Sequence, residues 1–375
     1  MPIIPLACTN FTAFFISFTS KLATLNYFSY LCTMITKRKT LIIILAALLT
    51  TAVVAAIIIA NMLCHSLSPR ETTYIYIDQD DDIDSVRSKL IATDADISMT
   101  AFDWLVTAKH YDQHIRVGRY EVSDRLSTLD LFRDLRNHNS KPINLVVPSV
   151  RTVELMAGRL ARQLMIDSTT IVNSFHDPST WATLGYNQQT FPALFIPNTY
   201  EIYWETSVER LVERLDKENK AFWNAERCTK AERIGLKKTE VITLASIVDS
   251  ETANDGEKAR IAGLYMNRLH RGILLQSDPT VIFAVGDFTI RRVLNKHLQV
   301  ESPYNTYRVA GLPPGPIRIP TIAGIDAVLN YEHNDYIYMC AKEDFSGTHN
   351  FAVNYAEHQA NARRYINALN QRGIK

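Results

Sequence analysis

An uncharged apolar segment near the start of the chain constrains its fold more than any other feature. Residues 41–63 read LIIILAALLTTAVVAAIIIANML and contain no charged side chain. At about 1.5 Å of rise per residue, a helix of this length crosses the roughly 30 Å hydrocarbon core of a bilayer. Helices of soluble cores normally carry polar residues on one face, and this segment has no such face. The sequence therefore predicts a membrane-spanning helix.

Basic residues predict how this helix crosses the membrane. Lys37, Arg38 and Lys39 come directly before it, and no comparable cluster follows it before Arg70. The positive-inside rule then keeps the N-terminus in the cytoplasm and exports the chain from about residue 66 onward. The segment is long, and no small-residue cleavage site precedes Cys64, so we expect a retained anchor rather than a signal peptide.

The residues ahead of the anchor allow two interpretations. Residues 1–33 are apolar and aromatic with a single charge, Lys21. A second span there would form a hairpin and put the basic cluster on the wrong side of the membrane. We treat residues 1–33 as an N-terminal extension, with Met34 as an alternative start to Met1, and residues 34–65 as a cytoplasmic tip followed by the anchor.

Composition excludes several classes of function. The 375 residues include 40 Lys and Arg against 39 Asp and Glu, so no excess positive charge favours nucleic acid. The acidic run at 78–84 lacks the Gly and Glu that a calcium-binding EF-hand loop needs, because Ile83 and Lys89 occupy those positions. No Cys or His spacing indicates zinc, and we expect neither a metal nor a cofactor. Cys228 and Cys340 lie in the exported part, and whether they form a disulfide stays open.

The exported part has the pattern of an α+β protein. Strand and helix patterns alternate in a first module at 66–148, and mainly helical patterns fill a connecting region at 149–239. The remaining 240–375 make a larger α+β domain. Within the first module we expect strands at 72–77, 117–122 and 143–148 and helices at 84–90 and 127–136, the second helix burying Leu129, Leu131, Phe132 and Leu135.

One carboxylate of the larger domain has the setting of a general acid. The apolar residues Val241, Leu244, Ala245 and Val248 follow helical spacing, with Glu251 at the edge of their stripe. By the same spacing Asp249 turns toward the polar face. A second helix should follow at 256–270, begun by Asn254 with Glu257 and stopped by Gly272. Glu251 thus lies at a helix C-terminus beside apolar residues, and both features raise a carboxyl pKa.

A raised pKa is what proton donation to a glycosidic oxygen requires, although an ordinary surface Glu near a helix end fits the same pattern. Further along, amide, carboxylate and aromatic groups stand beside the Pro-rich turn at 313–316, and they suit a sugar-lined cleft or else a rigid loop with satisfied polar groups. These are Gln276, Asp278, Tyr304, Asn305 and Tyr307. No nucleophile elbow, phosphate loop or HExxH motif is present.

Several ordered motifs resemble the YceG-like family of membrane-anchored endolytic murein transglycosylases. They are LASIVDSET (244–252), NRL (267–269), QSDPTV (276–281), SPYNTY (302–307) and GLPPGPI (311–317), with LFIPNTY (194–200), YIYMCA (336–341) and His358. The resemblance extends over about residues 72–370. It implies a LysM-like first module and a catalytic domain at 240–375 with Glu251 as the catalytic acid. Asn198, Ser277 and Gln359 depart from the residues that many members have.

The resemblance implies a reaction, a substrate and a location. Glu251 would cleave the β-1,4 bond from N-acetylmuramic acid to N-acetylglucosamine within a glycan strand, leaving a 1,6-anhydro end and terminating nascent strands. Gln276, Asp278, Tyr304, Asn305 and Thr306 would bind the sugars. Peptidoglycan strands and their synthases would be the partners, and the bacterial inner membrane the location, with the catalytic part in the periplasm.

Two other functions stay open at this point. A muramidase-type hydrolase would use Asp278 as its second carboxylate, because hydrolysis by these enzymes typically needs a pair. A non-catalytic scaffold would only bind peptidoglycan, although such a protein has no need of a shielded acid.

Overall fold

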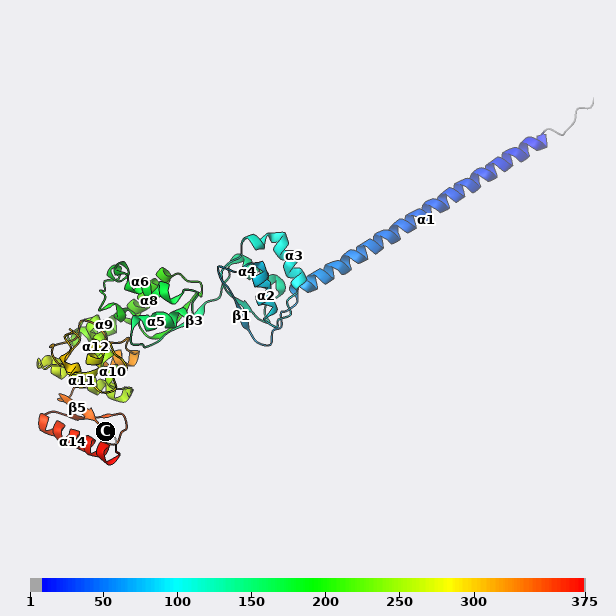
Figure 1. Ribbon diagram of the computed structural model, residues 1–375. Coiled ribbons are helices and arrows are strands. Elements are labelled where there is room, and N and C mark those ends of the chain that lie inside the picture. Colours follow the sequence, from blue (N-terminus) through cyan, green and yellow to red (C-terminus); the bar gives the residue numbers. More distant parts are fainter. Residues whose placement is uncertain (1–8, 374–375) are drawn as a thin grey trace, which may run out of the picture. The chain divides into compact units, whose positions relative to one another are not determined.

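The computed structural model describes residues 9–373, with side chains from residue 33 onward. The start at Met1 therefore lies outside the described residues. The chain is a helix-rich α+β protein that divides into two compact units (Figure 1). The first contains the residues up to 75 with 81–116 and 120–139, and the second contains 76–80, 117–119 and the chain from residue 140 onward.

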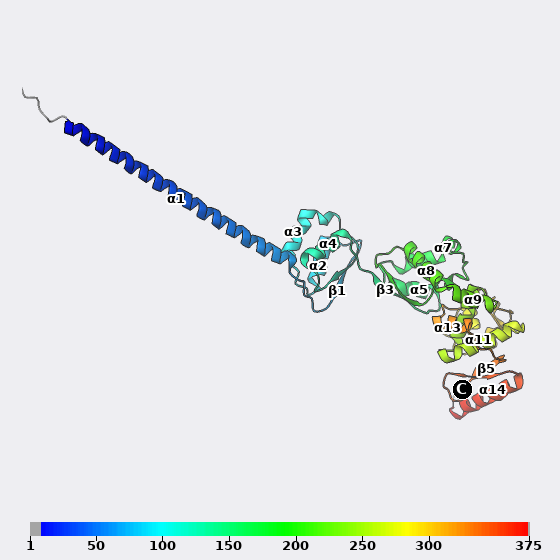
Figure 2. The ribbon, with the colours of Figure 1, turned by 180° about the vertical axis from the view of Figure 1, so that it is seen from behind.

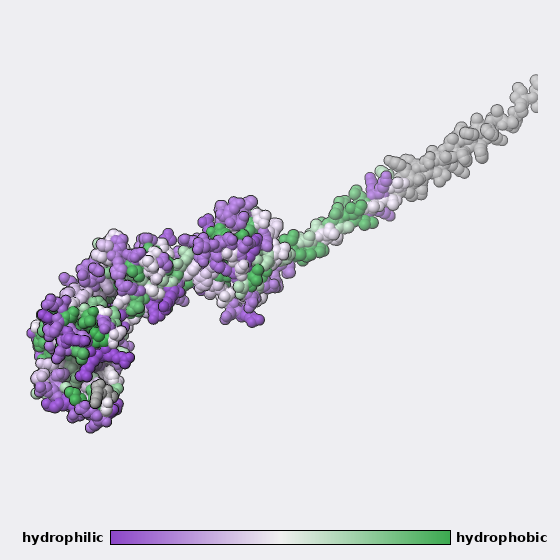
Figure 3. Space-filling model, viewed as in Figure 1, coloured by the Kyte–Doolittle hydropathy of each residue, from purple (hydrophilic) through white to green (hydrophobic). Residues whose placement is uncertain are grey.

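Helix α1 (Thr9–Cys64) carries the predicted anchor. Among the described residues, its segment Thr33–Cys64 is long enough and apolar enough to cross a membrane. The most apolar part of this segment is not buried by protein. Apolar side chains such as Ile43 and Leu49 are about two-thirds exposed, at 67% and 66%. In Figure 3 a hydrophilic segment precedes a hydrophobic one along this helix. The helix is therefore a candidate membrane anchor, and its unbroken course from Thr9 leaves no hairpin in the described part.

The first unit packs helices around a small sheet. Strands β1 (Thr73–Ile77) and β2 (Gly118–Val122) were both predicted as strands, and they pair in a two-stranded sheet. The ring of Phe132 contacts Phe102 and Tyr111 with centroids 6.0 and 5.6 Å away. The predicted Leu131 and Leu135 are buried, whereas Leu129 is only half-buried. The helical elements here are α2 (Ile83–Ile91), α3 (Met99–Lys109), η1 (Tyr111–Gln113) and α4 (Thr128–Asn137).

The third strand that the sequence placed in this module pairs elsewhere. Strand β3 (Ile143–Val147) runs antiparallel to β4 (Asn198–Ile202), with Ile143 opposite Ile202 and Val147 opposite Asn198. The prediction followed proximity along the chain, but the alternation of apolar side chains fixes only which face of a strand is buried. The choice of partner depends on contacts more than fifty residues away.

The β3–β4 pair lies against helices of the second unit. Leu145, Phe175, Phe195 and Leu211 belong to one buried apolar cluster that joins the sheet to these helices. The helical elements are α5 (Val153–Ala161), α6 (Ser168–His176), α7 (Pro178–Thr183), η2 (Phe191–Leu194), α8 (Val208–Phe222) and α9 (Ala225–Arg233), which agrees with the helical patterns predicted for this stretch.

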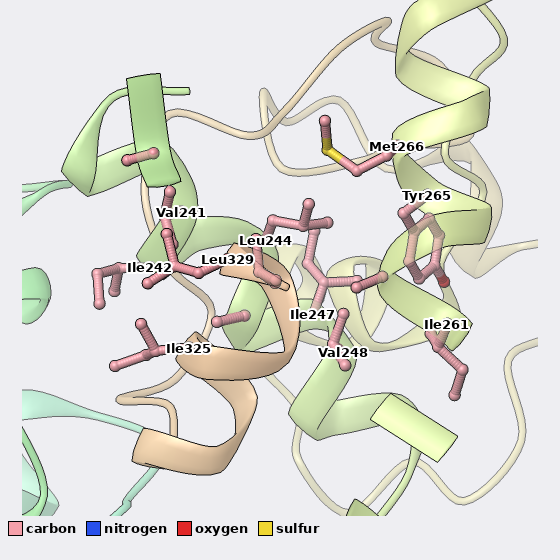
Figure 4. Packing of buried hydrophobic residues seen from close by; sticks show 14 of the residues in the cluster. Val241, Ile242, Leu244, Ile247, Val248, Ile261, Tyr265, Met266, Ile325 and Leu329 are labelled. Atoms are coloured by element: carbon pink, nitrogen blue, oxygen red, sulfur yellow. The ribbon is translucent and has the colours of Figure 1, made fainter. Parts of the chain in front are cut away.

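Helix α10 (Lys238–Glu251) is the central element of the second unit, and it is buried on every side rather than along one stripe. All residues from 241 to 249 are buried. Figure 4 shows Val241, Leu244 and Ile247 of this helix among apolar side chains of its neighbours. Its small polar residues are satisfied internally, since Ser246 Oγ accepts from Ile317 N at 3.0 Å. The neighbours are α11 (Asp255–His270), α12 (Asp278–Val285) and α13 (Ile322–Leu329).

The expectation that Asp249 faces solvent is therefore wrong. Its carboxylate forms an ion pair with Lys258 of α11 at 2.7 Å, and the two side chains are 2% and 5% exposed. It also accepts from the backbone N of Thr321, directly before α13, at 2.5 Å. Gly324 of α13 has to be glycine, because a Cβ there would lie 2.5 Å from Asp249 Oδ1. The buried pair thus joins three helices, a contact that local periodicity does not reveal.

The chain ends in a hairpin and a helix. Strands β5 (Tyr338–Ala341) and β6 (His349–Ala352) pair antiparallel, and α14 (Tyr355–Gln371) packs against them (Figure 2). The short helix η3 (His297–Gln299) lies in the loop between α12 and α13. Cys64, Cys228 and Cys340 are free thiols, so Cys228 and Cys340 do not pair in this structure.

Replacement of Lys258 by Met should destabilise the second unit strongly. The change leaves the Asp249 charge buried without its partner, which costs about 3–5 kcal/mol in comparable cases. Chemical denaturation of the full-length chain in detergent, followed by circular dichroism, would measure the midpoint. Lys230→Met removes an i,i+4 pair with Glu226, which is 71% exposed, and should cost no more than about 1 kcal/mol. Equal midpoints for the two variants would contradict this account.

Candidate active site

Glu251 is the last residue of α10, and one of its two carboxyl oxygens is fixed by hydrogen bonds. Tyr265 donates its hydroxyl to Glu251 Oε1 at 2.6 Å, and Ser277 donates to the same atom at 2.5 Å. Within the part of the chain described here, Oε2 accepts no hydrogen bond. Two donors therefore hold one oxygen of the carboxyl group, and the other is free to carry a proton.

Burial dominates the electrostatics of this carboxyl group. It raises the pKa of Glu251 above the ordinary value of 4.5, and the charge of Asp278 adds to the rise. The hydrogen bonds from Ser277 and Tyr265 and the charge of His349 oppose it without cancelling it. Burial and the neighbouring Glu251 raise the pKa of Tyr265 well above its usual range, so its hydroxyl stays a donor. The raised pKa expected for Glu251 is therefore found, with desolvation as its main cause.

The two donors come from different parts of the second unit. Tyr265 lies on α11 within the buried apolar cluster around α10, which fixes its ring (Figure 4). Ser277 lies in the bend before α12, where its backbone N donates to Thr306 Oγ1 at 3.0 Å. Gln276, just before it, has φ of +54°, a left-handed conformation that is uncommon outside glycine. This bend is held in place by side chains of a loop some thirty residues later.

Glu251 lines a cavity of about 400 Å³. Helices α11 and α12 and the bend before α12 form one side, and the β5–β6 hairpin with α14 forms the other. The polar and aromatic side chains that line it with Glu251 are Tyr265, Arg268, Gln276, Asp278, Tyr307, Tyr338, His349 and His358. A shielded carboxylic acid therefore faces a polar cavity with a size in the range of small-ligand sites.

The predicted binding residues separate into two groups. Gln276 and Asp278 line the cavity with Glu251. Asp278 Oδ1 accepts from the Tyr307 hydroxyl at 2.7 Å, and Gln276 Oε1 accepts from Arg268 at 2.6 Å. Both side chains are exposed to the cavity side of the bend, so the structure brings them together with the acid.

The other three predicted residues do not line this cavity. Asn305 is fully buried, and its side-chain amide donates to the backbone oxygens of Leu298 and Val300, both at 2.9 Å. Thr306 is 1% exposed and supports the bend through Ser277. Tyr304 lines a second cavity. Their local sequence looks like a binding motif, but their hydrogen bonds are used to shape the loop.

Arg268 connects the two sides of the cavity. Its guanidinium donates to Leu274 O at 2.8 Å and to Gln276 Oε1 at 2.6 Å in the bend, and to Ile337 O at 2.5 Å beside the hairpin. The sequence pattern does not predict that Arg268 bridges the cavity, because a basic residue near a helix C-terminus is common as an ordinary cap.

Two histidines of the hairpin and α14 complete the far side. Glu257 accepts from the backbone N of His349 at 2.8 Å and contacts its Nδ1 at 3.0 Å, which fixes the imidazole near Glu251. Glu257 is thus not the capping partner that the sequence indicated; Asn254 alone caps α11, through Gly256 N at 3.0 Å. His358 stacks on Tyr338 with centroids 5.2 Å apart. Burial and the charge of Arg268 lower its pKa, so it is a neutral imidazole near pH 7.

Comparisons with known proteins show the family to which this chain belongs. The model of the YceG-like family matches residues 75–364. A protein of Bacillus subtilis named endolytic murein transglycosylase is 32% identical over 169 residues, which are 45% of this chain and 46% of that protein. One of the same name from Streptococcus pneumoniae is 24% identical over 306 residues, 71% of this chain and 53% of that protein. The chain thus aligns with about half the length of these relatives.

A solved structure supports the fold. The crystal structure of a yceG-like protein from Listeria monocytogenes superposes with a TM-score of 0.51 at 24% identity, and the match covers 77% of this chain and 99% of that one.

The raised pKa of Glu251 makes a prediction about stability. A raised folded-state pKa contributes stability that is present below about pH 4.5 and is lost as pH rises through the folded value. The glutamine of Glu251→Gln cannot ionise. The melting temperature of this variant, relative to that of the parent chain, should therefore rise as pH increases from about 4 to about 8. Thermal denaturation of both full-length chains would measure this. Glu213→Gln, which replaces an exposed carboxylate of α8, is the control and should show no such trend. A melting-temperature difference between Glu251→Gln and the parent chain that falls with rising pH would contradict a raised pKa for Glu251.

Proposed function

Because the chain belongs to the YceG-like family, we propose that it is an endolytic lytic transglycosylase that cleaves the glycan strands of peptidoglycan. The relatives of Bacillus subtilis and Streptococcus pneumoniae, both named endolytic murein transglycosylase, support this activity. The observation that carries the proposal is Glu251, a carboxyl group with a raised pKa in a polar cavity.

The reaction needs one group that first donates and then accepts a proton. Glu251, protonated on Oε2, donates to the oxygen that leaves the anomeric carbon of N-acetylmuramic acid as the glycosidic bond breaks. The resulting carboxylate takes the proton of the muramic 6-hydroxyl, whose oxygen bonds to the same anomeric carbon. Glu251 returns to its starting state, a 1,6-anhydro end forms, and no water is consumed. A single carboxyl group is sufficient for this intramolecular route, whereas glycoside hydrolysis typically uses two.

The hydrogen bonds to Glu251 suit both halves of this cycle. A general acid works best when its pKa lies near the operating pH. Burial raises the pKa of Glu251, and the donors Tyr265 and Ser277 limit the rise because they stabilise the carboxylate. Ser277 stands where many family members have Thr, and either residue supplies the hydroxyl. We infer that these donors tune the acid and fix its orientation.

The binding roles follow the positions of the side chains. We propose that Gln276 and Asp278 bind sugar hydroxyl and acetamido groups, because both line the cavity with Glu251. Asn305 and Thr306 act as positioning residues, since both are buried and bonded within the loop. Tyr304 would contact substrate only through the second cavity.

The remaining proposals concern the membrane anchor and the other parts of the chain. We propose that α1 anchors the chain once in the bacterial inner membrane, with the Lys37–Lys39 cluster in the cytoplasm and the chain from about residue 66 onward in the periplasm. The α+β module predicted at 66–148, without β3, would be LysM-like, residues 149–239 would connect it, and residues 240–375 would carry the reaction. Termination of nascent strands would bring peptidoglycan synthases close as partners.

The activity has a direct test. The full-length chain in detergent should shorten purified peptidoglycan strands and leave 1,6-anhydromuramic ends, identified by liquid chromatography and mass spectrometry. Glu251→Gln should lower the rate by about 10²- to 10⁴-fold, the usual contribution of a general acid. Glu213→Gln, which removes an exposed carboxylate far along the sequence, should leave the rate unchanged.

Other outcomes would assign other functions. Reducing ends in place of anhydro ends would indicate a muramidase-type hydrolase. Binding of strands by the parent chain without any cleavage would favour a scaffold. Full activity of Glu251→Gln would remove this residue from the chemistry.

Asp278→Asn distinguishes binding from chemistry. If Asp278 binds sugar, losing a charged hydrogen bond worth about 1.5–3 kcal/mol should raise KM roughly tenfold or more and leave kcat within a few fold. The products should remain anhydro ends. Steady-state kinetics with strands of defined length would separate the two constants. A fall in kcat comparable to that of Glu251→Gln would contradict the binding role and make Asp278 a second catalytic carboxylate.

A further inference from the structure

The second unit contains another cavity, which the proposed chemistry does not use. It has a volume of about 300 Å³ and lies among α5, α6, α12 and the loops before η2 and α13. Its aromatic wall consists of Phe283, Phe288 and Tyr304, with Phe283 and Tyr304 centroids 4.7 Å apart. Gln188 and Gln189 line it as well. Aromatic surface with a few polar groups is the usual composition of a ligand site.

Two polar groups of this cavity have no partner. Within residues 33–373, the Arg151 guanidinium makes no hydrogen bond or ion pair and lies over the Phe288 ring, 4.9 Å from its centroid. The hydroxyl of Tyr304 is likewise without a hydrogen bond in that part of the chain. The one acidic residue of the lining, Glu154, is already paired with His176 at 2.9 Å. The cavity therefore contains a guanidinium without an ion-pair partner in that part of the chain, beside aromatic rings.

The backbone is shaped closely around the aromatic wall. A Cβ on Gly315 would lie 2.0 Å from the backbone oxygen of Gln189 and 3.3 Å from the Tyr304 hydroxyl. The turn before α13 can therefore approach Gln189 and Tyr304 only because residue 315 is glycine. The wall is built by close backbone contact rather than by loosely placed side chains.

The two cavities share their supporting elements. Helix α12 presents Asp278 to the cavity of Glu251 and Phe283 to this one. Five residues of helix separate them by about 7.5 Å along the axis. The loop at 302–307 does the same with Tyr307 and Tyr304. Side chains five residues apart in a helix point about 140° away from each other, so the two cavities lie on different sides of α12 and share it as a wall. A ligand that reaches both has to be a polymer that passes around these shared elements.

We propose that this second cavity is a subsite for the same strand and binds a sugar unit through the carboxylate of its peptide stem. The inference rests on the proposed function, because it takes the glycan of peptidoglycan as the ligand. Arg151 would bind the carboxylate through its planar fork of N–H donors, a geometry that favours carboxylates. The rings of Phe288 and Tyr304 would pack against the sugar, and the Tyr304 hydroxyl would donate or accept one hydrogen bond.

Binding to the inactive Glu251→Gln chain tests this without requiring cleavage. The probes are purified glycan strands that keep their peptide stems, and the same strands after an amidase has removed the stems. The full-length protein in detergent should bind the stem-bearing strands more tightly. Arg151→Ala should weaken that binding about tenfold and leave binding of the bare strands unchanged, and Arg151→Lys should have a smaller effect. Arg159→Ala, an exposed arginine on α5, is the matched control and should change neither.

The outcomes separate this proposal from the proposed function. Equal affinity for strands with and without stems, or equal weakening of both by Arg151→Ala, would overturn the subsite. An unchanged affinity in Arg151→Ala would do the same, even if the parent chain cleaves peptidoglycan. A stem-dependent loss in Arg151→Ala would support the subsite even if the parent chain proves inactive. Thermal denaturation of each variant would show that a loss of binding is not a loss of fold.

Discussion

The buried ion pair of Asp249 and Lys258 is the constraint on which the position of the acid depends. Two charges with side chains 2% and 5% exposed persist in a protein interior only when each satisfies the other. Asp249 lies two residues before Glu251 on α10, and its carboxylate also binds the backbone of Thr321. The pair therefore fixes the rotation of the last turn of α10 against α11 and α13. That rotation decides which face of the helix end Glu251 occupies.

The site combines a buried helical side with a half-buried hairpin side. The acid and its donor Tyr265 come from helices of the buried cluster, whereas Tyr338 and His349 come from a hairpin whose strands are mostly half-buried. Arg268 bridges the two, because it binds the bend before α12 and the backbone at Ile337. Its charge also helps to keep His358 neutral. One arginine thus links the two sides of the cavity and, after burial, contributes to the lowered pKa of His358 on the far side.

Sequence reasoning identified what depends on neighbours along the chain. The apolar segment, the strands β1 and β2, the helix α10 and the desolvated position of Glu251 all follow from local patterns. The partners of Glu251 do not, since Tyr265 and Ser277 reach it from 14 and 26 residues away. The pairing of β3 with β4 and the burial of Asp249 were missed for the same reason, because both depend on residues that are distant in the sequence. The family resemblance suggested a catalytic role for Glu251, and it also suggested sugar contacts for Asn305 and Thr306, whose hydrogen bonds are used within the loop.

The loop at 302–307 links the acid to the second cavity. Thr306 accepts from the backbone N of Ser277, and Ser277 donates to Glu251, so the position of this loop determines one of the two hydrogen bonds that hold the acid. Tyr304, two residues earlier, faces the second cavity. A ligand that packs on Tyr304 would restrain the loop and with it the Ser277 donor. Since ordering a loop in advance lowers the cost of later binding, occupancy of the second cavity would favour the geometry in which Glu251 donates its proton. Such a link would suit the endolytic cleavage proposed above, because cleavage would be favoured where the strand continues past the bond to be cleaved.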